Sequence, residues 1–273
     1  MKNRSPCSML FLFGIACLFS CQSSEEWIFE KEISLKNITP IGLVATNQNL
    51  WISDVANNRI VKTDLEGKLI EEYSGFERPM HIALHQSRIY VPEYTTDTIK
   101  VIADGKTEVL PMNEKPDAPG GIAVADKIIA VADFYNHRII VQTADATITV
   151  GKEGHNPGEL YYPTDVEIHD EKIFVADAYN NRIQVFDLAG NHLQVIGEKD
   201  NIQVATGIGI GLDQVFVTDF EGNRLLVYDL NGVLKQILEV GLDKPSDLII
   251  LAGQLLVVNY GNNALAVFKL QIK

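Results

Sequence analysis

The chain has 273 residues, of which 8% are aromatic, and carries a formal net charge of −13. A surface this acidic repels phosphate backbones, so nucleic acid is excluded as an expected partner. All three cysteines lie within the first 21 residues, which excludes disulfides, zinc–thiolate sites and cysteine nucleophiles from the rest of the chain.

The N-terminus has the pattern of a secretion signal. A basic start is followed at residues 9–19 by an apolar stretch that is too short to span a bilayer as a helix. Leu18-Phe19-Ser20-Cys21 resembles the bacterial lipobox, which implies cleavage before Cys21 and lipid attachment to its sulfur; the alternative is an ordinary secretory signal with an incidental cysteine. We expect a signal peptide at 1–20, a polar tether at 21–26 and an outer-membrane lipoprotein of the cell envelope, on its periplasmic or outer side, held to the membrane through Cys21.

From residue 51 onwards, an apolar run that ends in an acidic or amide residue recurs six times at steps of 39 to 44 residues. A fixed period of this length with several β-rich runs predicts a β-propeller. We call the last residues of these runs the anchor residues: Asp54, Glu93, Asp133, Asp177, Asp219 and Asn259.

The fourth period illustrates the predicted blade. Runs rich in Val, Ile and Phe occupy residues 163–168, 172–178, 181–188 and 192–198, and Asp187 to Gly190 form a tight turn between the last two. Four such runs predict one four-stranded antiparallel blade. Six periods therefore predict an all-β, six-bladed propeller spanning residues 27–273.

The last period contains only three strand-like runs before the chain ends at Lys273. Residues 27–35 form an additional strand-like run before the first period. We predict that this N-terminal strand completes blade six, which closes the ring and protects its edges.

An arginine follows the anchor residue by five positions in four of the periods. An acid at the end of one strand and an arginine at the start of the next can pair across the connecting loop, which predicts a structural staple. The pairs are Asp54/Arg59, Asp133/Arg138, Asp177/Arg182 and Asp219/Arg224.

Residues 151–163 (GKEGHNPGELYYP) and 179–191 (YNNRIQVFDLAGN) resemble the NHL repeat, in which spaced glycines precede an aromatic residue and a proline. The resemblance covers nearly all of residues 39–273. It implies a six-bladed propeller, the usual form of this family.

The position twelve residues before each anchor residue alternates between glycine and a polar residue, in the order Gly42, His81, Gly121, Asp165, Gly207 and Asp247. We expect this position near the mouth of the central channel, where His81, Asp165 and Asp247 could hold Zn²⁺ or Ca²⁺. The alternative is that the aspartates cap turns. The NHL-like class includes the peptide-amidating lyase and gluconolactonase-like propellers, so the resemblance implies a metal-dependent lyase or hydrolase as one candidate.

Aromatic residues follow most of the anchor residues by one or two positions: Tyr94, Phe134, Tyr135, Tyr179, Phe220 and Tyr260. If exposed around a pocket, they suit a sugar, a peptide or a protein loop, whereas the alternative is packing against the neighbouring blade. Because no complete catalytic set is visible, we expect a binding or scaffold propeller for a protein, peptide or glycan, with a metal-dependent enzyme as the alternative.

Overall fold

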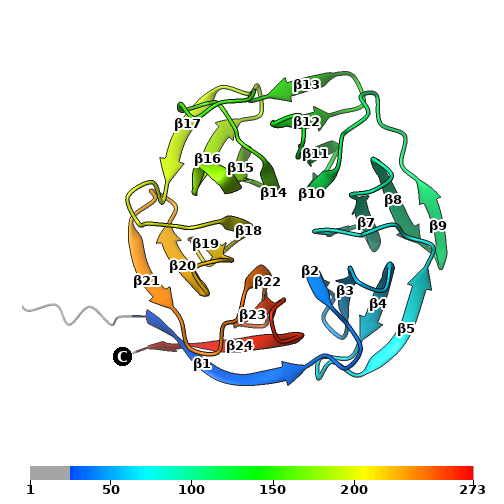
Figure 1. Ribbon diagram of the computed structural model, residues 1–273, viewed down its shortest axis with the longest axis vertical. Coiled ribbons are helices and arrows are strands. Elements are labelled where there is room, and N and C mark those ends of the chain that lie inside the picture. The colour runs from blue at the N-terminus through cyan, green and yellow to red at the C-terminus, as the bar shows by residue number, and fades with distance from the viewer. Residues whose placement is uncertain (1–24, 273) are drawn as a thin grey trace, which may run out of the picture.

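The computed structural model describes residues 25–272, which form six four-stranded antiparallel sheets arranged as blades around a central axis (Figure 1). The predicted all-β, six-bladed propeller is therefore confirmed. Apart from the strands, a single 3₁₀ turn, η1 (Ala178–Asn180), is present in the described range. No helix within that range is long and apolar enough to cross a membrane.

Each blade runs outward from an inner strand beside the axis to an outer strand at the rim. Blade one consists of β2 (Pro40–Ala45), β3 (Leu50–Asp54), β4 (Arg59–Thr63) and β5 (Leu69–Ser74). Blade two consists of β6 (Ala83–His85), β7 (Arg88–Glu93), β8 (Thr98–Ala103) and β9 (Lys106–Val109). Blade three consists of β10 (Pro119–Ala125), β11 (Ile128–Asp133), β12 (Arg138–Gln142) and β13 (Thr147–Val150). Blade four consists of β14 (Pro163–His169), β15 (Lys172–Asp177), β16 (Arg182–Asp187) and β17 (His192–Ile196). Blade five consists of β18 (Ala205–Gly211), β19 (Gln214–Asp219), β20 (Arg224–Asp229) and β21 (Leu234–Leu238). Blade six consists of β22 (Pro245–Leu251), β23 (Gln254–Asn259) and β24 (Ala264–Ile272), with β1 (Glu25–Ser34) as its outer strand.

The core lies between the blades. Val, Ile and Leu are the commonest residues of the two middle strands of the blades, and their side chains point to both faces of the sheet, as expected for strands buried on both sides. One cluster shows the pattern: Val185 and Ile183 of blade four pack with Val217 and Leu226 of blade five, and all four are buried. Each blade is thus stabilised by its two neighbours, which makes closure of the ring essential.

Closure is achieved by the N-terminal strand, as predicted. β1 pairs antiparallel with β24 along its length, from Glu25 opposite Ile272 to Ser34 opposite Ala264. Trp27 is buried and donates its indole N–H to Gln214 of blade five at 2.9 Å. The strand begins at Glu25, two residues earlier than the expected start at residue 27. Cys21 and the other residues of the expected signal and tether up to residue 24 lie outside the described range.

The propeller has two faces. The loops that follow the anchor residues and the segments that lead into the inner strands lie together on one, which we call the loop face. The turns between the inner strand and the next strand lie on the other, which we call the hairpin face. The last residue of each anchor loop has φ between 51° and 58°, a conformation that Asn and Asp tolerate best. This explains the recurring Asn-Arg pairs. The six residues are Asn58, Asp97, His137, Asn181, Asn223 and Asn263.

Candidate functional site

All six anchor residues are fully buried and fix the loops of the loop face. In blade three, for example, the Asp133 carboxylate accepts hydrogen bonds from the Asp117 main-chain N–H and from Arg138, both at 2.7 Å. The predicted staple is therefore present, and it also reaches back to the segment that enters the inner strand. The same Arg–Asp pairing recurs at 2.7 Å in blade one, 2.9 Å in blade four and 2.8 Å in blade five.

The two blades without an arginine replace it differently. In blade two, Glu93 pairs with Lys100 at 3.0 Å, seven residues further along. In blade six, Asn259 uses its own amide, donating to the Gly241 carbonyl and accepting from the Asp243 N–H. The buried polar side chain at each anchor position thus has hydrogen-bond or ion-pair partners, as buried polar groups generally do.

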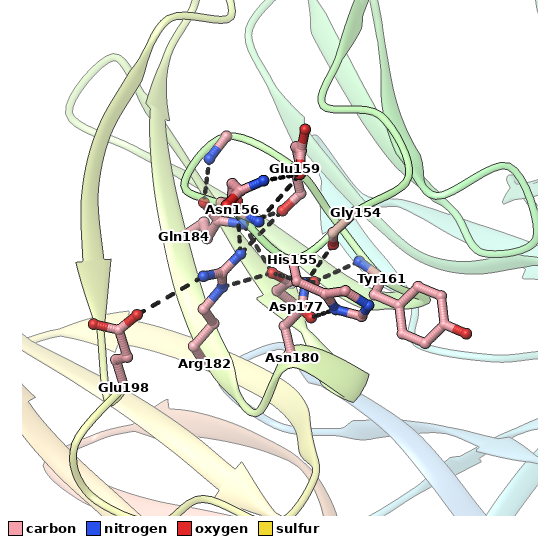
Figure 2. A network of polar contacts seen from close by, with 11 residues as sticks. Gly154, His155, Asn156, Glu159, Tyr161, Asp177, Asn180, Arg182, Gln184 and Glu198 are labelled. Carbon is pink, nitrogen blue, oxygen red and sulfur yellow. Dashed lines mark hydrogen bonds and ion pairs between the residues drawn. The ribbon is translucent and has the colours of Figure 1, made fainter.

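The most extensive of these networks holds the segment 151–162, which crosses the loop face between blades three and four (Figure 2). Arg182 donates to the Asn156 and Glu159 carbonyls at 2.9 and 3.2 Å. Gln184 accepts from the Gly158 N–H at 2.7 Å. Side chains of blade four therefore determine the path of a segment that begins in blade three.

This network orients a pair of tyrosines. The Tyr161 N–H donates to Asp177 at 2.7 Å, and the Tyr162 N–H donates to His137 Nδ1 at 3.0 Å. The imidazole of His137 also stacks on the Tyr161 ring, with centroids 5.1 Å apart and an interplanar angle of 6°. Tyr162 itself has φ +53°, an unfavourable value that these contacts hold in place.

Five aromatic side chains line a pocket of about 380 Å³ on the loop face over blades two to four: Tyr94, Phe134, Tyr135, Tyr162 and Tyr179. We call it the aromatic pocket. Tyr135 and Tyr179 remain 49% and 57% exposed, large fractions for aromatic residues of a folded domain. The rings support each other, since Phe134 lies 4.9 Å from Tyr162 and the Tyr94 hydroxyl donates to the Tyr135 hydroxyl at 2.8 Å. Burial, and then the Tyr135 hydrogen bond, raise the pKa of Tyr94, so its phenol stays neutral.

The structure brings together four of the six aromatic residues singled out from the sequence. Phe220 and Tyr260 instead pair with each other, 5.7 Å apart, over blades five and six. Tyr162 was missed because it precedes an inner strand and does not follow an anchor residue. The Tyr-Tyr-Pro sequence before that strand was its only signal.

The three predicted metal donors also converge. His81 lies two residues before β6, and Asp165 and Asp247 lie in the inner strands β14 and β22; their ligand atoms are all within 4.8 Å of one another. His81 Nδ1 lies 3.5 Å from the Asp165 carboxylate. Only 2% of His81 is exposed, and neither ring nitrogen has a hydrogen-bond partner in the described part of the chain. Such an orphaned imidazole beside two carboxylates fits a divalent cation, although metal binding itself stays a prediction.

The two carboxylates also join blades. Asp165 accepts the Ile208 N–H of blade five at 2.9 Å, and Asp247 accepts the Leu43 N–H of blade one at 2.7 Å. The alternating glycines let the inner strands of neighbouring blades approach closely, since a Cβ on Gly42 of blade one would lie 2.6 Å from the Met80 carbonyl oxygen of blade two. Part of the alternation along the sequence is therefore explained by how the inner strands pack.

The donor cluster lies at one end of a cavity of about 270 Å³ in the central channel, which extends along the inner strands toward the hairpin face. The cluster is buried in the channel and shares no lining residue with the aromatic pocket. Glu167, two residues along β14, adds a third carboxyl group. Burial raises the pKa of Asp247 to about 7, since the lowering by the nearby His81 is partly offset by the charge of Asp165. Burial, and then the charges of Asp165 and Asp247, raise the pKa of Glu167 well above its usual value. Burial lowers the pKa of His81, but the negative charges of Asp165 and Asp247 outweigh it and raise the pKa overall.

The likeness to known proteins is mainly one of fold. A family described as "6-bladed beta-propeller" matches residues 153–257. No curated protein matches the chain by sequence.

Several solved structures share the propeller. A streptogramin B lyase is 16% identical, with a TM-score of 0.66 over 91% of this chain and 98% of the other. The virginiamycin B lyase of Staphylococcus aureus is 20% identical, with a TM-score of 0.65 over 92% and 90%. A gluconolactonase from Xanthomonas campestris is 14% identical, with a TM-score of 0.71 over 88% and 89%. At these identities the shared property is the architecture.

Proposed function

We propose that this protein is a cell-envelope binding propeller that holds its ligand in the aromatic pocket. The observation that carries the proposal is the set of five rings around one hollow, two of them about half exposed. Exposed tyrosines supply a large, rigid contact area that loses little entropy on binding, and they are enriched at recognition sites. The anchor networks hold the loops in place before a ligand arrives, which lowers the cost of binding.

The proposal includes NHL-type repeats, a lipid anchor at Cys21 and a protein, peptide or glycan as ligand. Each of these ligands can place an apolar ring or a flat sugar face against tyrosine. The acidic surface argues against polyanions, because the net charge of −13 opposes their approach.

The test is a comparison of pocket variants on arrays of proline- and aromatic-containing peptides and of cell-envelope glycans. We expect Tyr135→Ala and Tyr179→Ala to weaken binding to the recognised probes at least tenfold. The matched control is Phe220→Ala, which removes an aromatic ring from the same face but outside the pocket. Equal binding by all four proteins, or binding by none, would reject the proposal.

A metal-dependent hydrolase or lyase is the second candidate. It is favoured by the His81 ring nitrogens, which have no hydrogen-bond partner in the described chain, and by two carboxylates within 4.8 Å. Similar folds are found in a gluconolactonase and in streptogramin-type lyases. His81, Asp165 and Asp247 would hold the ion. A divalent cation there would polarise a carbonyl group or activate water. The substrate would have to enter the channel from the hairpin face, where the cavity extends.

Elemental analysis separates the two candidates. If the second is correct, protein equilibrated with Zn²⁺ or Ca²⁺ and then desalted retains about one ion per chain, and His81→Ala loses it. Asp165→Asn is a useful companion variant, because an amide oxygen can still accept the Ile208 N–H while the charge is lost. Wild-type protein that retains neither ion would exclude this candidate.

A further inference from the structure

Arg78 lies at the edge of the aromatic pocket and has no ion-pair partner within residues 25–272. The four arginines that follow anchor residues are each paired with a buried aspartate at 2.7 to 2.9 Å. Arg78 is exposed, and its guanidinium lies 4.5 Å from the centre of the Tyr94 ring, which is one wall of the pocket. A guanidinium without an ion-pair partner thus lies beside a hollow lined by aromatic rings.

The position of this arginine is well defined. Its main-chain N–H donates to the Asn58 side-chain oxygen at 2.8 Å. Its φ is +55°, a conformation that recurs just before the inner strands at Ala118, Tyr162 and Lys244. The equivalent Lys244 lies over Phe220 but approaches the Glu221 carboxylate at 3.8 Å. Arg78 thus differs from Lys244 in that no carboxylate of the described chain forms an ion pair with it, although Glu77 lines the neighbouring hollow.

Arg78 also borders a second hollow of about 400 Å³ on the loop face, together with Asn58, Glu77, Thr95 and Tyr260. A ligand that fills the aromatic pocket can therefore extend past the guanidinium onto this surface. A planar guanidinium is the best side chain for pairing with a carboxylate through two parallel hydrogen bonds.

We infer that the aromatic pocket and Arg78 together recognise the C-terminus of a peptide, with the last aromatic or proline ring in the pocket and the terminal carboxylate on Arg78. This inference rests on the proposed binding function and narrows it to one ligand class. A single carboxylate suits a site with one free cation on a strongly acidic protein, whereas a polyanionic glycan would be repelled. The five pocket residues provide only phenol hydroxyls as polar groups, fewer than the many hydroxyls of a sugar would require.

The test uses two probes that differ in one group, the tripeptide acetyl-Gly-Pro-Phe with a free carboxylate and the same peptide as its carboxamide. Binding is measured by NMR titration of the full propeller. We expect the carboxylate to bind about tenfold more tightly, which corresponds to about 1.4 kcal/mol. Arg78→Gln should reduce its affinity to that of the amide, and Arg78→Lys should restore part of it. Added salt should weaken only the carboxylate form.

The outcomes separate this inference from the proposed function. If both forms bind equally and Tyr135→Ala weakens both, the pocket binds ligands but the carboxylate assignment is wrong. If neither form binds at millimolar concentration, the peptide assignment is wrong, and the glycan array described above still tests the pocket. If a uronic-acid oligosaccharide binds more tightly than the peptide and depends on Arg78, the ligand is a glycan and the inference is overturned.

Discussion

At the scale of single residues, the buried anchor residues are the strongest determinants of the loop face. Asp177 is fully buried and accepts hydrogen bonds from Arg182 at 2.9 Å and from Gln184 at 2.8 Å. Its removal leaves the buried Arg182 guanidinium with only the exposed Glu198 carboxylate, 4.0 Å away, and the loss of a buried partner typically costs about 3–5 kcal/mol. We therefore expect Asp177→Ala to lower the free energy of unfolding by this amount in urea titrations. It should also weaken ligand binding, because the Tyr161 N–H loses its acceptor.

The matched control is Glu66→Ala, which breaks an ion pair of similar length. Glu66 lies 3.0 Å from Lys31, but both side chains are exposed to solvent. Exposed pairs contribute about 0–1 kcal/mol, so this variant should unfold almost like the parent. Similar losses in the two variants would show that burial is not what gives the anchor residues their importance.

The channel carboxyl groups predict an unusual pH dependence of stability in protein freed of metal by a chelator. Asp247, with its pKa raised to about 7, holds its proton more tightly in the folded chain than in the unfolded one, where the value is about 3.9. Its contribution to the free energy of unfolding is therefore complete at low pH and is lost as the pH rises from about 4 to 7. Glu167 and His81, whose pKa values are also raised, change the stability in the same direction. We expect the Tm to fall between pH 5 and 8.

Glu167→Gln tests the origin of this slope. The amide cannot lose a proton, so the fall in Tm across the same range should be smaller in this variant. Exposed Glu108→Gln on β9 serves as the control and should leave the slope unchanged. A Tm that is constant or rises between pH 5 and 8 in the parent would contradict the shifts in pKa.

At the scale of elements, the closing strand is the part on which the ring depends. Without β1, the β24 edge from Ala264 to Ile272 would be unpaired and the Trp27 site between blades five and six would be empty. We expect a chain that starts at residue 36 to aggregate or to melt well below a chain that starts at residue 25. A synthetic peptide of residues 25–35 should restore much of the difference, because it can add to the free edge. Equal melting of the two chains would contradict the role of β1.

Elements were predictable from the sequence because each repeats six times. The period and the four runs per blade indicated the sheets, and the strand deficit in the last period indicated β1. The Gly/polar alternation likewise placed His81, Asp165 and Asp247 at or near the inner strands of alternate blades. The sequence could not show that the cluster lies inside the channel, or that Tyr162 belongs with Tyr94, because both depend on how adjacent blades pack.

At the scale of the whole molecule, the direction of β1 determines which face lies nearest the N-terminus. Glu25 pairs with Ile272 at the hairpin-face end of β24, and Ser34 pairs with Ala264 at the loop-face end. The chain therefore enters the propeller at the hairpin face. If Cys21 carries lipid, four residues before this point, the hairpin face lies next to the membrane and the aromatic pocket on the loop face points away from it, where a ligand can approach.

This orientation gives a prediction for the acylated protein. Cys21→Ser should move the protein from the membrane to the soluble fraction, because the acidic surface offers no electrostatic attachment of its own. In the acylated protein, cleavage of the signal leaves an introduced cysteine as the only free thiol. A fluorophore at Lys127→Cys, in the turn of the hairpin face, should be quenched by spin-labelled lipids in vesicles. The same fluorophore at Thr95→Cys on the loop face is the control and should be quenched much less. Equal quenching at both positions would mean that the propeller does not sit on the membrane by its hairpin face, and membrane retention of Cys21→Ser would exclude the lipid anchor.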